Sequence, residues 1–163
     1  MLADEHGGDR AAYPGVRLDF STSVGPLGTP PAVAQAITAA IPAIDRYPDP
    51  ACRGLRAALA AHHGLTASTI ACGNGAADII HRIAWALRPR RVLTFAPTFT
   101  EYAHSARAVD AEVIHQPLSP PYFDLTDATL AAVTDGIDLV FCCQPNNPTG
   151  RLTAADRLAQ LVD

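Results

Sequence analysis

The sequence predicts an α/β fold, because segments with apolar residues at helical spacing alternate with short, unbroken apolar runs that are typical of buried strands. Its 14 prolines and 11 glycines separate these segments. With 163 residues and 48% apolar side chains, the chain is long enough to bury a core without disulfides or a structural metal. We therefore expect a mostly parallel sheet with helices on both faces.

Two helices are expected in the first part of the chain. Apolar residues four apart predict a short helix over residues 31–41. Asp49 followed by Pro50 is typical of an N-cap and a first helical residue. A second helix is therefore expected to begin there and to bury Leu55 and Leu59 on one face.

A strand, a tight turn and a helix are expected next. The short apolar run at 69–72 predicts the strand, and two glycines close behind it predict the turn at 73–75. Apolar residues at helical spacing over 79–87 predict the helix, which Arg88 and Pro89 end. This is the order strand, turn, helix.

The same alternation continues to the end of the chain. It predicts strands at 92–95, 112–115 and 139–143 and helices at 99–107 and 125–133. The run at 139–143 is wholly apolar, as expected of a parallel strand buried on both faces. Thr153, with Asp156 three residues later, predicts a capping box that opens a last helix.

Composition excludes several classes of protein. The net charge of −4 argues against a nucleic-acid partner. The four cysteines lack the spacing that holds zinc, so we expect thiols in a reducing cytosol and no metal site. Residues 1–10 lack the basic and apolar regions of a signal peptide, and no apolar run is long enough to span a membrane, so we expect no signal peptide and a cytoplasmic protein. All 12 basic residues are arginines, which excludes chemistry that needs a lysine amine.

Three loops follow strands at the sheet edge where α/β proteins bind ligands. The first, 73–77, offers free backbone N–H groups at a helix N-terminus, which either hold a phosphate or form a tight turn that holds nothing. The second, 96–102, places two aromatic rings three residues apart, which either stack on a flat heterocycle or pack against the sheet.

The third loop, 144–150, contains two prolines, two asparagines and a glycine. This composition predicts a rigid, irregular loop that carries amide side chains at the same sheet edge. Only bonds to proline are commonly cis, so Asn147-Pro148 and Ala96-Pro97 are candidates for cis peptides.

Together these motifs resemble the fold type I pyridoxal-phosphate enzymes of the class I/II aminotransferase superfamily. The matching segments, in order, are Gly73-Asn74-Gly75, Pro97-Thr98-Phe99 and Asn147-Pro148-Thr149-Gly150. Arg46-Tyr47-Pro48-Asp49 is similar to the histidinol-phosphate aminotransferase branch. His6-Gly7-Gly8, Leu18-Asp19-Phe20-Ser21 and Pro26-Leu27-Gly28 are more similar to threonine-phosphate decarboxylase of cobalamin biosynthesis.

The resemblance implies an organisation for the chain. Residues 1–30 would be an N-terminal arm, and residues 31–163 the N-terminal portion of a partial, incomplete PLP-transferase-like large domain. In that family, three strands from later in the sequence separate the strand at 69–72 from the strand at 139–143. The chain is therefore expected to be a truncated member that associates with copies of itself or with a complementing C-terminal half.

The resemblance also implies roles for individual residues. Backbone N–H groups of Asn74, Gly75 and Ala76 would hold the phosphate of the cofactor, pyridoxal 5′-phosphate. Phe99 would stack on its ring, and Asn147 would donate to its phenolic oxygen and lie near the substrate carboxylate.

Further residues are implied outside these loops. Tyr47 would reach the cofactor phosphate of the neighbouring subunit in a homodimer. His6 and Gly7 would lie near the phosphate of a phosphorylated amino-acid substrate. Ser23 stands where the family has a substrate-contacting asparagine, which leaves the identity of the substrate open.

Two functions of different class follow. The first is an N-terminal segment of an aminotransferase or decarboxylase, of the histidine or cobalamin biosynthesis type, that is inactive alone. No catalytic residue is assigned in it, because the family's cofactor-binding lysine has no counterpart and covalent attachment is not possible in this sequence. The second is a non-catalytic α/β anion-binding or interaction module.

Overall fold

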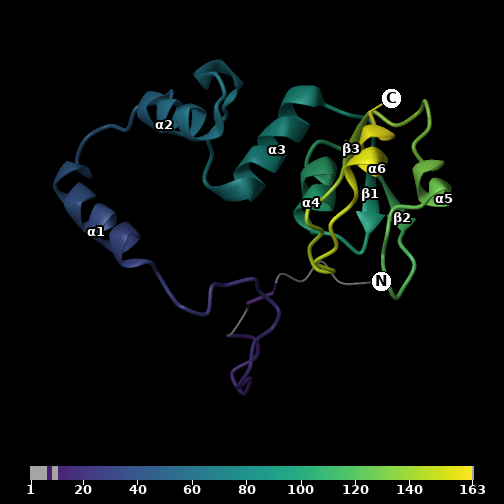
Figure 1. The fold of residues 1–163 in the computed structure, drawn as a ribbon, viewed down its shortest axis with the longest axis horizontal. Helices are drawn as coiled ribbons and strands as arrows, with labels where there is room; N and C mark the ends of the chain where they lie inside the picture. The colour runs from purple at the N-terminus through teal and green to yellow at the C-terminus, as the bar shows by residue number, and fades with distance from the viewer. Residues whose placement is uncertain (1–6, 9–10, 163) are drawn as a thin grey trace. The chain divides into compact units, whose positions relative to one another are not determined.

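The computed structural model describes residues 7–8 and 11–162, and the chain divides into two compact units (Figure 1). The first unit is Met1–Cys72 and the second is Gly73–Asp163. In the described part of the chain, no helix is both long and apolar enough to cross a membrane.

The first unit is helical. Its elements are α1 Pro31–Ala40, the 3-10 turn η1 Ile41–Ala43, α2 Arg53–His63 and the 3-10 turn η2 Ala67–Thr69. The helix predicted at 31–41 is thus confirmed, except that Ile41 belongs to η1. Proline suits the first position of α1, because its fixed φ matches a helix and its missing N–H is not needed there. No residue of α1 is buried within this structure.

The second predicted helix forms, but it begins later than expected. Asp49 is not its N-cap: the carboxylate of Asp49 accepts the backbone N–H groups of Arg53 at 2.7 Å and Ala51 at 3.1 Å, and the helix starts at Arg53. These two donors hold the pKa of Asp49 below its usual value. The burial prediction was also wrong, because Leu55 is 55% exposed and Leu59 is only half-buried.

The strand predicted at 69–72 is absent. η2 takes up Thr69, and Ile70 is extended, with φ −104° and ψ 125°, but no described segment pairs with it. A strand is stabilised by the ladder of hydrogen bonds to its neighbour, and extended dihedral angles alone do not supply one.

The second unit is built around a three-stranded parallel sheet in the order β2-β1-β3 (Figure 1). The strands are β1 Arg91–Ala96, β2 Glu112–Pro117 and β3 Leu139–Phe141. In this register Val92 of the central strand lies opposite Val113 on one side and Leu139 on the other. The predicted parallel sheet is confirmed, with β3 ending two residues earlier than expected.

Helices cover both faces of this sheet, as predicted. Alternate residues of β1 point to opposite faces, so Val92 and Leu93, both fully buried, belong to two different cores. The Val92 core packs under α3 Gly75–Leu87 and α4 Glu101–Arg107 through Ile80 and Ala106. The Leu93 core lies on the side of α5 Asp127–Leu130, opposite α4 in Figure 1.

Asp138 joins the beginnings of β1 and β3. Its carboxylate accepts the backbone N–H groups of Arg90 at 2.7 Å and Arg91 at 2.9 Å, and its own N–H donates to the carbonyl of Arg91. The bond from Arg91 and then that from Arg90 lower the pKa of Asp138 below its usual value. Because the folded pKa is lowered, this contribution to stability is present at neutral pH and is lost as the pH falls through that pKa.

Two later helices differ from expectation. The helix predicted at 125–133 is the four-residue α5, with a capping box between Thr126 and Thr129. The capping box predicted for Thr153 and Asp156 is absent: α6 Ala155–Ala159 has no side-chain cap. Thr153 instead bonds through its backbone to a side chain of the β3 loop, described below.

Candidate functional site

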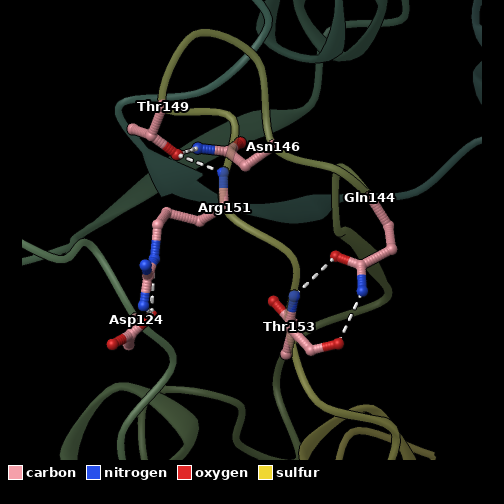
Figure 2. A network of polar contacts seen from close by, with 6 residues as sticks. All are labelled: Asp124, Gln144, Asn146, Thr149, Arg151 and Thr153. Atoms are coloured by element: carbon pink, nitrogen blue, oxygen red, sulfur yellow. Dashed lines mark hydrogen bonds and ion pairs between the residues drawn. The ribbon is translucent and has the colours of Figure 1, made fainter.

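The loops after β1 and β3 are tied together by one side chain. Asn146 accepts a hydrogen bond from the hydroxyl of Thr98 at 3.0 Å and donates through Nδ2 to the carbonyl of Pro97 at 3.0 Å. Its Nδ2 also donates to Thr149 Oγ1 at 2.9 Å within its own loop (Figure 2). The predicted rigid loop is therefore cross-linked to the neighbouring strand's loop by Asn146, a residue to which the motif analysis gave no role.

The same loop is held near its two ends by two further contacts, both drawn in Figure 2. Gln144 donates to the carbonyl of Thr153 at 2.6 Å and accepts the N–H of Thr153 at 3.0 Å. Arg151 forms an ion pair with Asp124, with Nη2 at 2.7 Å from Oδ1. The backbone between Gln144 and Thr153 is thus held by side chains together with two backbone hydrogen bonds of Asn146, without a helix or a ladder.

The two predicted cis peptides are confirmed. Ala96-Pro97 and Asn147-Pro148 are both cis, as are Gln144-Pro145 and Pro120-Pro121.

The aromatic residues of the β1 loop pack inward. Phe99 is half-buried and meets Tyr102 edge to face, with ring centroids 5.7 Å apart. Tyr102 stacks on Phe141 at the end of β3, with centroids 4.7 Å apart and an interplanar angle of 10°. Both rings pack against the Val92 core. Packing against the sheet, one of the two expectations for this loop, is therefore what these rings do in this structure, and stacking of Phe99 on a cofactor remains a prediction.

Tyr102 also connects this aromatic pair to the β3 loop. Burial, and then its hydrogen bond to the thiol of Cys143, raise the pKa of the Tyr102 phenol above its usual value of 10. Burial likewise raises the pKa of the neighbouring Cys142 thiol, with a smaller effect from Cys143. The Tyr102 phenol and the Cys142 thiol therefore keep their protons at neutral pH.

Tyr102 should make the fold sensitive to alkali. Because its pKa is raised on folding, the unfolded chain loses the phenolic proton at lower pH than the folded chain, and the free energy of unfolding falls as the pH rises above about 10. Urea unfolding between pH 8 and 11 measures this. We expect the midpoint of the parent to fall more steeply than that of Tyr102→Phe. Equal slopes would contradict the assignment.

The turn predicted to hold a phosphate forms at the start of α3. Gly75 has a φ of +82°, which favours glycine. A Cβ on Gly73 would lie 2.8 Å from Asp78 Oδ2, so the turn also needs a small residue there. The N–H of Ala76, by contrast, has no partner among the described residues, and it lies in the first turn of a helix of 13 residues.

Two of the three predicted phosphate donors are already used. The N–H of Asn74 donates to Asp78 Oδ2 at 2.8 Å, and the N–H of Gly75 donates to the carbonyl of Gly73 at 2.9 Å. The other oxygen of Asp78 pairs with Arg82 at 2.9 Å. No role was predicted for Asp78, although an acidic residue in the first helical turn is a known signal for stabilising a helix N-terminus.

Asn147 differs from its neighbour Asn146. It is exposed, its backbone N–H donates to the sulfur of Cys143 at 3.4 Å, and its side-chain amide has no partner among the described residues. The amide is thus available to a ligand, as the prediction for this residue requires.

The remaining predicted residues lie in the first unit. Tyr47 is fully exposed. Gly7 packs closely on the backbone of Ser21. The hydroxyl of Ser21 accepts the N–H of Gly8 at 2.8 Å. The two glycines therefore contact a residue that lies two positions before Ser23 in the sequence. Ser23 is exposed, and His6 lies outside the described residues. In residues 7–8 and 11–162, no group of three or more potential ligands could hold a metal ion.

Curated relatives carry the same two enzyme names that the motifs suggest. Threonine-phosphate decarboxylase of Salmonella typhimurium is 40% identical over 147 residues, which are 90% of this chain and 40% of that protein. Histidinol-phosphate aminotransferase of Paramagnetospirillum magneticum is 38% identical over 161 residues, covering 94% of this chain and 43% of that protein. The chain thus spans about two fifths of the length of these relatives.

Solved structures agree. Histidinol-phosphate aminotransferase from Sinorhizobium meliloti, in complex with pyridoxal 5′-phosphate, superposes with a TM-score of 0.75 at 27% identity, over 83% of this chain and 38% of that one. L-threonine-O-3-phosphate decarboxylase from Porphyromonas gingivalis gives 0.71 at 28% identity, over 86% and 41%. The family described as aminotransferase class I and II matches residues 17–163. The resemblance drawn from the motifs is therefore confirmed, and this chain belongs to the aminotransferase class I and II family.

Proposed function

We propose that this chain forms the non-covalent part of a pyridoxal-phosphate site, in an aminotransferase or threonine-phosphate decarboxylase-like enzyme that acts on a phosphorylated amino acid. The observation that carries the proposal is the free N–H of Ala76 at the start of α3, in a chain 40% identical to the Salmonella typhimurium decarboxylase. Because the chain covers 40% of that protein, the activity of a whole enzyme is part of the proposal.

The described residues suit the cofactor in part. The Ala76 N–H and the positive end of α3 suit its phosphate, and the exposed Asn147 amide can donate to its phenolic oxygen. Phe99, in the loop after β1, has a half-buried ring that can stack on the cofactor ring. When bound, the cofactor supplies the electron sink for reactions at the amino-acid carbon.

Asp78 opposes this binding. Its carboxylate already accepts the Asn74 N–H, and its negative charge would repel a phosphate at the same turn. For Asn74 to donate to a phosphate, the Asp78 side chain has to turn away, with Arg82 as its remaining partner. We therefore expect an affinity limited by this competition.

The chain is proposed to be inactive by itself. It contains no lysine, and an arginine side chain stays protonated at working pH, so no side chain can supply the amine that binds the cofactor covalently. The lysine has to come from residues that are not in this sequence, and a second copy of the chain does not supply it.

Binding of pyridoxal phosphate to the purified chain tests the proposal. Equilibrium dialysis and the ³¹P NMR shift of the ligand measure its affinity. Ala76→Pro removes the free donor while keeping a residue that the first helical turn tolerates, and it should weaken binding about tenfold or more, as expected for one hydrogen bond to a charged group. Borohydride treatment and peptide mapping should find no adduct on any internal peptide.

Ala32→Pro is the matched control, because it makes the same change in the first turn of α1, at a residue whose N–H also has no partner in the structure. It should leave the affinity unchanged. If pyridoxal without its phosphate binds equally well, or if Ala76→Pro has no effect, the proposed phosphate site is wrong. Equal affinity for inorganic phosphate and pyridoxal phosphate would favour the anion-binding module.

A further inference from the structure

Every polar group of Asn146 is used. Besides its side-chain bonds to Pro97, Thr98 and Thr149, its backbone N–H donates to the carbonyl of Arg151 at 2.8 Å and its carbonyl accepts the N–H of Gly150 at 2.7 Å. The residue is half-buried. An amide that is satisfied in this way is not available to a ligand, so its role has to be sought in what it holds.

The two loops that Asn146 connects carry the two residues proposed to contact the cofactor ring. Phe99 directly follows Thr98 in one loop, and Asn147 directly follows Asn146 in the other. The bonds from Asn146 to Pro97 and Thr98 are each 3.0 Å long and bridge 49 and 48 residues of sequence. These two bonds therefore fix the position of Phe99 relative to Asn147, because they join the residues directly before each of them.

Gln144 and Arg151, two other polar side chains at this loop, bond elsewhere. Gln144 bonds to Thr153 and Arg151 bonds to Asp124 (Figure 2), and neither contact involves Pro97 or Thr98. They hold the two ends of the loop. They do not directly set the distance between the two ring-contacting residues.

We propose that Asn146 is a positioning residue, which holds Asn147 and Phe99 at the spacing that the cofactor ring requires. This inference rests on the proposed function for the ring contacts. The bonds of Asn146 themselves are independent of it. A positioning residue for the ring should leave the phosphate end of the site, at Ala76, unaffected.

Asn146→Asp and Gln144→Glu form a matched pair. Each replaces an amide by a carboxylate of the same shape in the same loop, adds one negative charge and removes one NH₂ donor group. In Asn146→Asp the carboxylate faces the carbonyl of Pro97, to which the amide donates in the parent. In Gln144→Glu the lost bond is the one to Thr153.

Two readouts are needed. In ¹⁵N–¹H and aromatic NMR spectra without any cofactor, Asn146→Asp should shift or broaden the signals of residues 98–100 and of the Phe99 ring, and Gln144→Glu should not. The dissociation constant for pyridoxal phosphate should rise about tenfold in Asn146→Asp and stay within about twofold in Gln144→Glu. The dissociation constant for inorganic phosphate should change equally little in both variants.

The result that overturns the inference is an unchanged 98–100 region in Asn146→Asp, or an equal effect of the two variants on pyridoxal-phosphate binding. If Asn146→Asp does not fold, Thr98→Val tests the same link from the other side by removing the hydroxyl that donates to Asn146. It should give the same NMR changes. If the parent chain binds no pyridoxal phosphate, the proposed function fails, and the cofactor-free spectra still decide whether Asn146 positions Phe99.

Discussion

Replacing Leu93 with alanine is expected to destabilise the second unit by about 3 kcal/mol, within the range of about 2–5 kcal/mol seen for buried leucines. Leu93 is fully buried in the central strand, where it packs with Phe95, Leu118 and Leu125. Truncation removes buried methyl groups and leaves a cavity. The parallel strands on both sides of β1 hinder collapse of the sheet into it.

Urea unfolding followed by circular dichroism measures the loss. Leu87→Ala is the matched control, because Leu87 is 60% exposed at the end of α3 and alanine suits a helix. It should change the free energy of unfolding by no more than about 0.5 kcal/mol. A loss of less than about 1 kcal/mol in Leu93→Ala would show that the Leu93 core is not packed as described.

Elements with a strong periodic pattern and a partner within the chain were predicted well. β1 Arg91–Ala96 contains the strand predicted at 92–95, and α3 Gly75–Leu87 contains the helix predicted at 79–87. β1 buries both of its faces and α3 buries one, against other elements of the second unit. The run at 69–72 has a strand-like composition but forms no ladder. Whether a run pairs depends on a second segment lying beside it, which the composition of the run does not reveal. An apolar pattern therefore predicts a strand reliably only where the strand that pairs with it can also be predicted.

Local capping was harder to predict. Asp49 does cap backbone N–H groups, but through a turn that delays the helix to Arg53. Thr153 was expected to cap α6, and its backbone is instead bonded by Gln144, nine residues earlier. In both cases a cap residue has several competing hydrogen-bond partners, and the three-dimensional path of the loop decides between them.

The site shows the same limit. Its loops, their order and two cis prolines could be predicted from composition and motif. The division of labour between two adjacent asparagines could not, because it depends on the carbonyl of Pro97 and the hydroxyl of Thr98, which only the parallel pairing of β1 and β3 brings next to Asn146. The capture of the Asn74 N–H by Asp78 likewise depends on the side-chain rotamer.

Phe141 is the residue through which the core and the site depend on each other. It is buried at the last position of β3, directly before the loop that carries Asn146 and Asn147, and its ring stacks on Tyr102. Phe141→Ala removes both the buried ring and the stacking partner, and we expect a loss of about 3–4 kcal/mol. Phe141→Leu retains most of the volume and should lose less than about 1.5 kcal/mol.

Titration of Tyr102 distinguishes loss of the Phe141–Tyr102 stacking from a general loss of packing. Because burial is the main cause of the raised pKa of Tyr102, uncovering its ring in Phe141→Ala should lower that pKa toward its usual value of 10. The phenolate absorbance of Phe141→Ala, compared with that of a Phe141→Ala, Tyr102→Phe double variant, reports the change. In Phe141→Leu the phenol should remain protonated to higher pH. If the Tyr102 titration is the same in Phe141→Ala and Phe141→Leu, stacking on Phe141 does not bury Tyr102. The contacts of Phe141 with Tyr102, and of Tyr102 with Cys143, would then not connect β3 to the loop that carries Asn146 and Asn147.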